Sequence, residues 1–315
     1  MIPWLLLSLL LVGGLAAVSE IDRQRVEALY PPIGRFSDVA GVRLHYTDSG
    51  VPATDGGPPV VLIHGASTSL LDFRASLIEP LSATHRVIAL DRPGHGYSDR
   101  PAMWPSPAEQ ARLTRGLLAQ LGVEQPVLVG HSWAGSVVLA YLLAYPDAAA
   151  GGVLLAGASH PWDGGVAWYN DLAGVPVVGH LFAHTVPLTL GRAAVAGGVR
   201  AAFAPGEPPD DYSARTGVAL ALRPDSFLAN AEDLRRLSPF LEQQSTYYGY
   251  IRRPLLLVTG GADTIVPPWN HAERLLDQAP NAELVRLPGV GHALHHVARD
   301  RIVALIDDFG RSARP

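Results

Sequence analysis

The stretch LVGHSWAGSVV, residues 128–138, decides the fold. It joins an apolar run typical of a buried strand to a second apolar run typical of a helix, and Ser132 lies at the junction. A strand and a helix approach each other closely at such a turn, so small residues are needed two positions to either side. Gly130 and Ala134 meet that need, with Gly135 just beyond. The pattern is that of a nucleophile elbow, G-x-S-x-G, with alanine in place of the second glycine.

Strands and helices alternate on both sides of this elbow. Buried strands are predicted by the apolar runs PPVVLIHG, HRVIALD, QPVLVG, GGVLLAGA, RRPLLLVTG and AELVRLPG, whereas VRLHYTD alternates like an exposed edge strand and YPPIGRF is typical of a linker. Helices are predicted over residues 107–121, 133–145 and 294–309, and from about residue 268. This alternation predicts an α/β fold with a mostly parallel sheet and helices on both faces.

One long interval, residues 159–250, contains no clear strand. It is rich in aromatic residues among Ala, Gly and Pro, and it is too long for an ordinary connection. We therefore predict an inserted helical cap, whose aromatic side chains together suggest an apolar pocket. The expected organisation is an N-terminal hydrophobic segment with a linker at 1–35, an α/β core made of 36–158 and 251–315, and the cap at 159–250.

A catalytic serine needs a base and a group that orients the base. Asp263 follows a predicted strand and His292 follows the last one, so the chain order Ser132, Asp263, His292 is the order that this elbow requires. Asp163, after the preceding strand, is an alternative acid. His295 and His296 could form a metal site with His292 only if a carboxylate or another ligand lay nearby, and the sequence has no HExxH pattern, so we predict one catalytic histidine, two helix residues and no metal.

Four motifs together resemble the α/β-hydrolase superfamily over residues 36–309: HGAS, DRPGHGYSDRP, GHSWAG, and GADTIVP followed by GVGH. The resemblance implies an oxyanion hole formed by the backbone N–H groups of Ala66 and Trp133. It also implies structural roles near the site for His64 and His131. The residues that resemble a supporting loop are Asp91, Gly94, Gly96 and Ser98.

The identity of the nucleophile narrows the reaction. Related haloalkane dehalogenases and epoxide hydrolases use a carboxylate, so Ser132 argues against those reactions. Carbon–carbon hydrolases, acyltransferases and cofactor-free haloperoxidases share the serine triad and remain alternatives, as does a ligand-binding module with vestigial catalysis. The leading hypothesis is a carboxylesterase or lipase-like serine hydrolase that acts without a cofactor on an apolar, small-molecule ester.

Composition excludes other classes. The net charge of -5 provides no basic surface for nucleic acid, and the absence of cysteine removes disulfides and thiolate catalysis. Residues 1–18 are apolar and carry no charged side chain. At roughly 1.5 Å per residue they would just cross a hydrocarbon core of about 30 Å. We therefore expect an N-terminal membrane anchor, with export after signal cleavage near residues 17–19 as the alternative.

Overall fold

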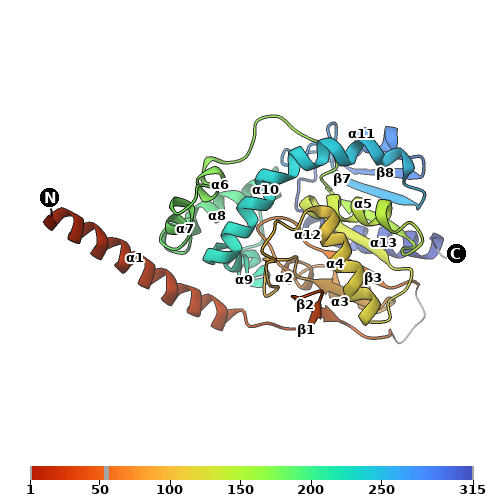
Figure 1. The fold of residues 1–315 in the computed structure, drawn as a ribbon. Coiled ribbons are helices and arrows are strands. Elements are labelled where there is room, and N and C mark those ends of the chain that lie inside the picture. The colour runs from red at the N-terminus through yellow and green to blue at the C-terminus, as the bar shows by residue number, and fades with distance from the viewer. Residues whose placement is uncertain (1, 53–56, 314–315) are drawn as a thin grey trace.

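The computed structural model describes residues 2–52 and 57–313, without the side chains of residues 2–12, 189, 190, 192 and 193. Within these residues the chain forms an eight-stranded sheet in the order β1-β2-β4-β3-β5-β6-β7-β8 (Figure 1). The six strands β3 to β8 run parallel to one another. Strand β2 is antiparallel to both of its neighbours, β1 and β4. The strands are β1 (Arg35–Val39), β2 (Val42–Asp48), β3 (Val60–Ile63), β4 (Val87–Leu90), β5 (Val127–His131), β6 (Gly151–Leu155), β7 (Leu255–Gly260) and β8 (Ala282–Leu287).

The sheet confirms the predicted parallel core and corrects one edge. The strands β3 to β7 are buried along their whole length, as continuous apolar runs predict for strands covered on both faces. The stretch VRLHYTD does form a strand, β2, but it is not the edge. Part of the predicted linker, from Arg35, pairs outside it as β1, with Arg35 opposite Tyr46. The short RFSDV run is mostly exposed, so its apolar pattern is too weak to predict a strand.

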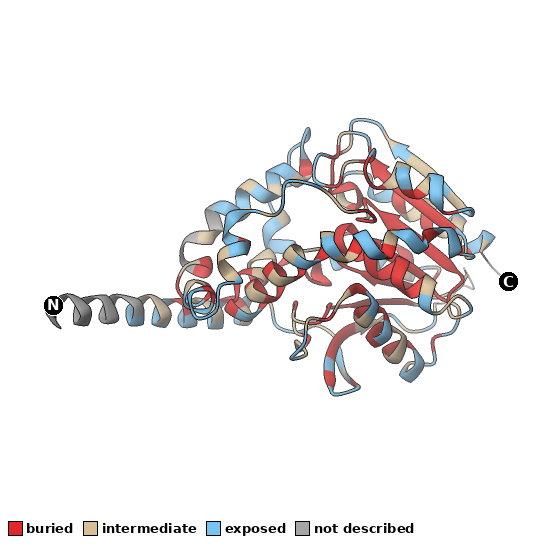
Figure 2. Cartoon of the chain, turned by 45° about the horizontal axis from the view of Figure 1, so that its top comes forward, coloured by how far each residue is buried: buried red, intermediate tan, exposed pale blue. Residues whose placement is uncertain are grey.

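Helices cover both faces of the sheet, and each face has its own apolar core. Alternate side chains of β3 show the division: Val61 and Ile63 belong to one core, and Val60 and Leu62 to the other. The first core includes α4 (Pro107–Gln120), α5 (Gly135–Ala144) and α11 (Ala272–Gln278). The second includes α2 (Leu71–Arg74), α3 (Ile78–Ser82), α12 (Leu294–Val297) and α13 (Arg299–Ser312). Figure 2 shows the buried residues concentrated in this central layer.

Between β6 and β7 the described chain contains helices and no strand, and we call residues 156–254 the helical segment. Its elements are α6 (Trp168–Ala173), α7 (Val178–Ala183), α8 (Pro187–Phe203), α9 (Tyr212–Thr216), η2 (Val218–Leu222), α10 (Pro224–Gln244) and η3 (Ser245–Tyr250). Several of its aromatic rings pack on one another, including Phe182 against Phe227 at 5.8 Å between ring centroids. The segment also contacts the loops that follow β3 and β8, because Asn230 bonds to Ser67 and Ala202 accepts a hydrogen bond from the N–H of Ala293.

The N-terminal helix α1 (Ile2–Leu29) differs from the expected anchor. In the part of the chain that the structure describes, we find no helix with both the length and the apolar character needed to cross a bilayer. The predicted anchor is therefore not supported, although the side chains of residues 2–12, on which much of that prediction rests, lie outside the described ones. The helix also continues past Val18 through a charged stretch, where Val26 is buried in the second core.

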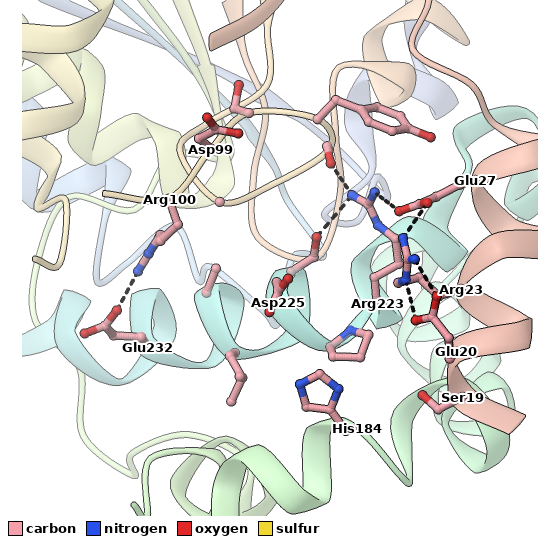
Figure 3. Close-up of a pocket in the computed structure, with 18 of the residues that line it drawn as sticks. Ser19, Glu20, Arg23, Glu27, Asp99, Arg100, His184, Arg223, Asp225 and Glu232 are labelled. Atoms are coloured by element: carbon pink, nitrogen blue, oxygen red, sulfur yellow. Dashed lines mark hydrogen bonds and ion pairs between the residues drawn. The ribbon is translucent and has the colours of Figure 1, made fainter. Parts of the chain in front are cut away.

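A polar groove of about 900 Å³ lies between α1, α10 and the loop after β4 (Figure 3). Its charged side chains pair with one another: Glu27 bonds to both Arg23 and Arg223, at 2.6 and 3.0 Å. Arg100 pairs with Glu232 at 2.8 Å. No residue of the predicted triad lines this groove. The ion pair between Glu27 and Arg223 links the C-terminal half of α1 to the helical segment.

Candidate active site

Ser132 lies on a sharp turn between β5 and the helical turn that leads into α5. Its φ of +54° is in the left-handed region, which a residue with a side chain rarely adopts. Close packing explains the small residues around it. A Cβ on Gly130 would lie 2.6 Å from the Ala134 oxygen, and one on Gly135 would lie 2.7 Å from the Gly157 Cα. The methyl group of Ala134 is accommodated and fully buried. The positions that cannot take a side chain are therefore Gly130 before the serine and Gly135 after it.

The structure brings the three predicted triad residues together. The Ser132 hydroxyl lies 2.9 Å from Nε2 of His292, and Nδ1 of His292 lies 2.8 Å from Oδ2 of Asp263. All three residues are less than 10% exposed. The Ser132 hydroxyl is therefore hydrogen-bonded to one nitrogen of the His292 imidazole, and the other nitrogen of that ring faces the Asp263 carboxylate.

Two backbone bonds hold Asp263 in place. Its Oδ1 accepts the N–H groups of Ile265 and Val266 at 2.8 and 3.0 Å, which leaves Oδ2 for His292. The alternative acid, Asp163, is exposed on the loop after β6. The geometry therefore favours Asp263 as the partner of His292.

The loop after β3 runs beside the serine. A Cβ on Gly65 would lie 3.0 Å from the Ser132 Cβ and 3.1 Å from Nδ1 of His131, so a side chain at this position would force its neighbours to shift. The carbonyl of Gly65 accepts a hydrogen bond from His64 Nδ1 at 2.8 Å and another from Arg92 at 3.2 Å. Among the described residues, the N–H of Ala66 donates to no protein acceptor. It is therefore free to bind a ligand oxygen.

Comparison with known proteins identifies the family. The α/β-hydrolase fold family matches residues 58–298, which is most of the chain. The chain is an α/β hydrolase.

Its relatives have several activities. A 2-hydroxymuconate semialdehyde hydrolase of Pseudomonas putida is 30% identical over 89% of this chain and 94% of its own length. Haloalkane dehalogenase 2 of Mycobacterium bovis is 29% identical over 92% of this chain and 100% of its own length. Among solved structures, Cfl2 of Burkholderia cenocepacia matches with a TM-score of 0.73 at 21% identity, covering 88% of this chain and 95% of that one. At that identity the structural likeness shows the fold alone.

Behind the loop after β3 of this α/β hydrolase lies a buried ion pair that the sequence did not indicate. Arg92 donates to Asp233 of α10 at 2.7 Å, and its guanidinium also lies over the Trp133 ring, 4.1 Å from the ring centroid. Asp233 pairs with Arg100 as well, at 2.9 Å. Although burial raises the pKa of Asp233, the neighbouring Arg92 holds it well below its usual range. The sequence shows only that Asn230 and Asp233 have i, i+3 spacing, which places both side chains on one face of α10. It does not show that this face meets Arg92.

The loop after β4, which the resemblance marks as a supporting loop, is held by the contacts of Asp91. The Asp91 carboxylate accepts the N–H groups of Leu70 and Tyr97 at 2.8 and 2.9 Å and contacts His45 at 2.6 Å. A Cβ on Gly96 would lie 2.0 Å from the same carboxylate, so glycine is required there. Asp91 therefore fixes the loop that carries Arg92.

The two histidines beyond His292 meet a carboxylate that the sequence did not reveal. Nε2 of His295 and Nε2 of His296 lie 2.8 and 2.7 Å from different oxygens of Asp72. In the described chain this is the one group whose donor atoms are close enough to hold a metal ion. Both separations are hydrogen-bond lengths, so Asp72 pairs with one nitrogen of each histidine. Nδ1 of His295 is buried and has no hydrogen-bond partner among the described residues. His131 stacks between this group and the triad, with its ring 4.3 Å from that of His295 and 4.9 Å from that of His292.

Proposed function

We propose that this α/β hydrolase cleaves a carboxylic ester through Ser132, His292 and Asp263. The observation that carries the proposal is the hydrogen-bonded chain from the Ser132 hydroxyl through His292 to Asp263. A serine hydroxyl becomes an effective nucleophile when a positioned imidazole can take its proton, and a carboxylate holds that imidazole in the correct tautomer. The strained, buried turn at Ser132 keeps the hydroxyl at this position.

The proposed reaction has two halves. In the first, His292 takes the proton of Ser132 while Oγ attacks the ester carbonyl, and His292 then gives that proton to the leaving alcohol as an acyl-enzyme forms. In the second, His292 takes a proton from water, which attacks the acyl-enzyme and releases the acid. Asp263 stabilises the imidazolium that exists in each half.

The oxyanion of each tetrahedral intermediate would bind the N–H groups of Ala66 and Trp133. Two facts support this role: the Ala66 N–H has no protein acceptor within the described chain, and its loop touches Ser132 through Gly65. Trp133 follows the nucleophile directly at the start of the helical turn. Donors aimed at charge that develops in the transition state contribute strongly, and removing one costs about 10²–10³ in kcat.

The helical segment is proposed to act as a cap over this site, with an apolar acyl or alcohol group held beneath it. The triad residues are almost fully buried although they lie at the ends of strands and in loops. The contacts of α8 and α10 with the loops after β8 and β3 support this role, because Ala202 bonds to Ala293, next to His292, and Asn230 bonds to Ser67. Such a cover excludes water from the site, which strengthens the electrostatic interactions within it.

A second candidate is hydrolysis of a carbon–carbon bond. The observation that favours it is the 30% identity to 2-hydroxymuconate semialdehyde hydrolase over most of both chains. The same serine, base and oxyanion donors could serve that reaction. Carbon–halogen cleavage is not proposed despite the dehalogenase relatives, because the elbow offers a hydroxyl where the resemblance implies a carboxylate nucleophile.

Hydrolysis of p-nitrophenyl esters of increasing acyl length tests the proposal. Wild type should release p-nitrophenol, S132A should not, and both should unfold at the same temperature. S238A, which alters a half-buried serine of α10 far along the helix, is the matched control and should keep wild-type activity. Residual S132A activity at the wild-type level would exclude the serine mechanism. Serine-dependent cleavage of 2-hydroxymuconate semialdehyde with no ester turnover would instead select the carbon–carbon reaction.

A further inference from the structure

Asn230, on α10 of the helical segment, bonds twice to one residue of the loop after β3. Its side-chain oxygen accepts the backbone N–H of Ser67 at 2.7 Å, and its amide nitrogen donates to the Ser67 hydroxyl at 3.0 Å. Asn230 is only 7% exposed, and 163 residues separate the two partners in sequence. Because the oxygen and the nitrogen of this buried amide both bond to Ser67, Asn230 acts as a clamp that restrains the position of Ser67.

Ser67 needs such a clamp because its backbone conformation is unfavourable. Its φ is +58°, in the left-handed region, where its Cβ is crowded by the backbone. Ser67 is also exposed, so packing around its own side chain does little to hold it. Without the bond from Asn230 to its N–H, the loop would relax toward a more common conformation.

The residue between Gly65 and Ser67 is Ala66, the proposed oxyanion donor. The peptide group before Ala66 is fixed through its carbonyl, which His64 and Arg92 bind at 2.8 and 3.2 Å. The peptide group after Ala66 is fixed through its N–H, which Asn230 binds. Because a trans peptide is planar and its N–H points opposite its carbonyl, these bonds together set the direction of the Ala66 N–H.

We propose that Asn230 is a positioning residue for the oxyanion hole, and that α10 of the helical segment is thereby part of the catalytic architecture. The inference rests on the proposed function, since it assumes that Ser132 is the nucleophile and that Ala66 binds the oxyanion. Asn230 acts through Ser67 and Ala66 on the transition state. It follows that N230A should lower kcat with little effect on KM, because the misdirected N–H matters most when the oxyanion forms.

The decisive measurement uses an alkyl phosphonofluoridate on the full-length chain, because it needs no knowledge of the natural substrate. Ser132 Oγ bonds to phosphorus, fluoride leaves, His292 takes the hydroxyl proton, and the phosphoryl oxygen occupies the oxyanion position. Loss of a whole donor costs about 10²–10³ in rate, so a misdirected donor in N230A should slow the reaction by about 10- to 100-fold. S67A, which keeps the N–H that Asn230 binds, should be slowed less.

Two further variants complete the test. S238A is the matched control, because Ser238 on the same helix makes a similar pair of bonds, both 3.1 Å, with the backbone of Trp162, away from the oxyanion loop. It should react at the wild-type rate. S67P leaves α10 intact but removes both the N–H and the left-handed conformation at residue 67, so it should be as slow as N230A even if N230A folds poorly.

The outcomes separate the two ideas. N230A or S67P reacting as fast as wild type, or S238A slowed as much as N230A, would overturn the role of Asn230 while leaving the serine mechanism in place. Failure of wild-type Ser132 to react would overturn the proposed function, and the positioning role with it. A rise in KM alone would assign Asn230 to ground-state binding and would also overturn the inference.

Discussion

Mild acid should destabilise the fold through His64 and His95, which lie buried beside the active site. Burial and the charge of Arg92 lower the pKa of His64 to about 3 and that of His95 to about 4. Their rings make an edge-to-face contact at 5.5 Å between centroids. In the folded protein both therefore remain neutral in mild acid, whereas in the unfolded chain both titrate near pH 6.5.

The magnitude follows from this difference. A histidine whose pKa is depressed by folding contributes stability that is complete above its unfolded pKa and is lost as the pH falls toward its folded pKa. Between about pH 7.5 and about pH 5.5, one histidine should cost about 1.4 kcal/mol of unfolding free energy, and the two together about 3 kcal/mol. Burial also lowers the pKa of His131, so the total loss should be no smaller. The depressed pKa of Asp233 affects stability only below about pH 4, outside this window.

Urea unfolding followed by tryptophan fluorescence at the two pH values measures the loss. H95Q should reduce the pH-dependent difference by about 1.4 kcal/mol, because one titrating group is gone. H180Q, which alters an exposed histidine of α7, should leave the difference unchanged. Equal stability at both pH values, or greater stability in acid, would refute the reasoning, and an undiminished difference in H95Q would refute it for His95.

Two further substitutions test the site and the elbow. D263N should reduce kcat in the ester assay by about 10⁴, as loss of the orienting carboxylate does in other triads. D163N should keep a kcat near that of wild type, because Asp163 is exposed. The opposite ranking would assign the acid of the triad to Asp163, on the loop after β6. G135A should lose about 1–3 kcal/mol of stability in urea unfolding, since its Cβ would lie 2.7 Å from the Gly157 Cα. G197A, which has open space around its Cβ in α8, should lose none, and equal effects in the two variants would contradict the packing argument.

The features that could be predicted from the sequence depend on local signals. The buried strands are continuous apolar runs, and the elbow is a turn whose small residues are close neighbours in the chain. Asp263 and His292 follow strand ends, so a parallel sheet brings them to the same edge as Ser132. Strand β1 was missed because an exposed edge of five residues has no apolar pattern.

The features that could not be predicted depend on the path of the helical segment. Asn230 and Asp233 meet residues 163 and 141 positions earlier in the chain, and nothing in the sequence indicates how α10 lies over the core. Asp72 lies in a short helix without a motif, 223 residues before His295. For the same reason the sequence does not show that a carboxylate lies beside His295 and His296, because no acidic residue close to them in sequence plays this part.

The histidines around Ser132 bear on the proposed role of His292 as the base. His131 lies between His292 and His295 in a stack of tilted rings, and burial lowers the pKa of both His131 and His295. Protonation of either ring would place a positive charge next to His292 and oppose the imidazolium that forms as Ser132 attacks. Of the rings in this stack, His292 is the one that contacts both the Ser132 hydroxyl and the Asp263 carboxylate. The lowered pKa of its two neighbours and the contacts of His292 with Ser132 and Asp263 therefore both support the proposed role of His292 as the base.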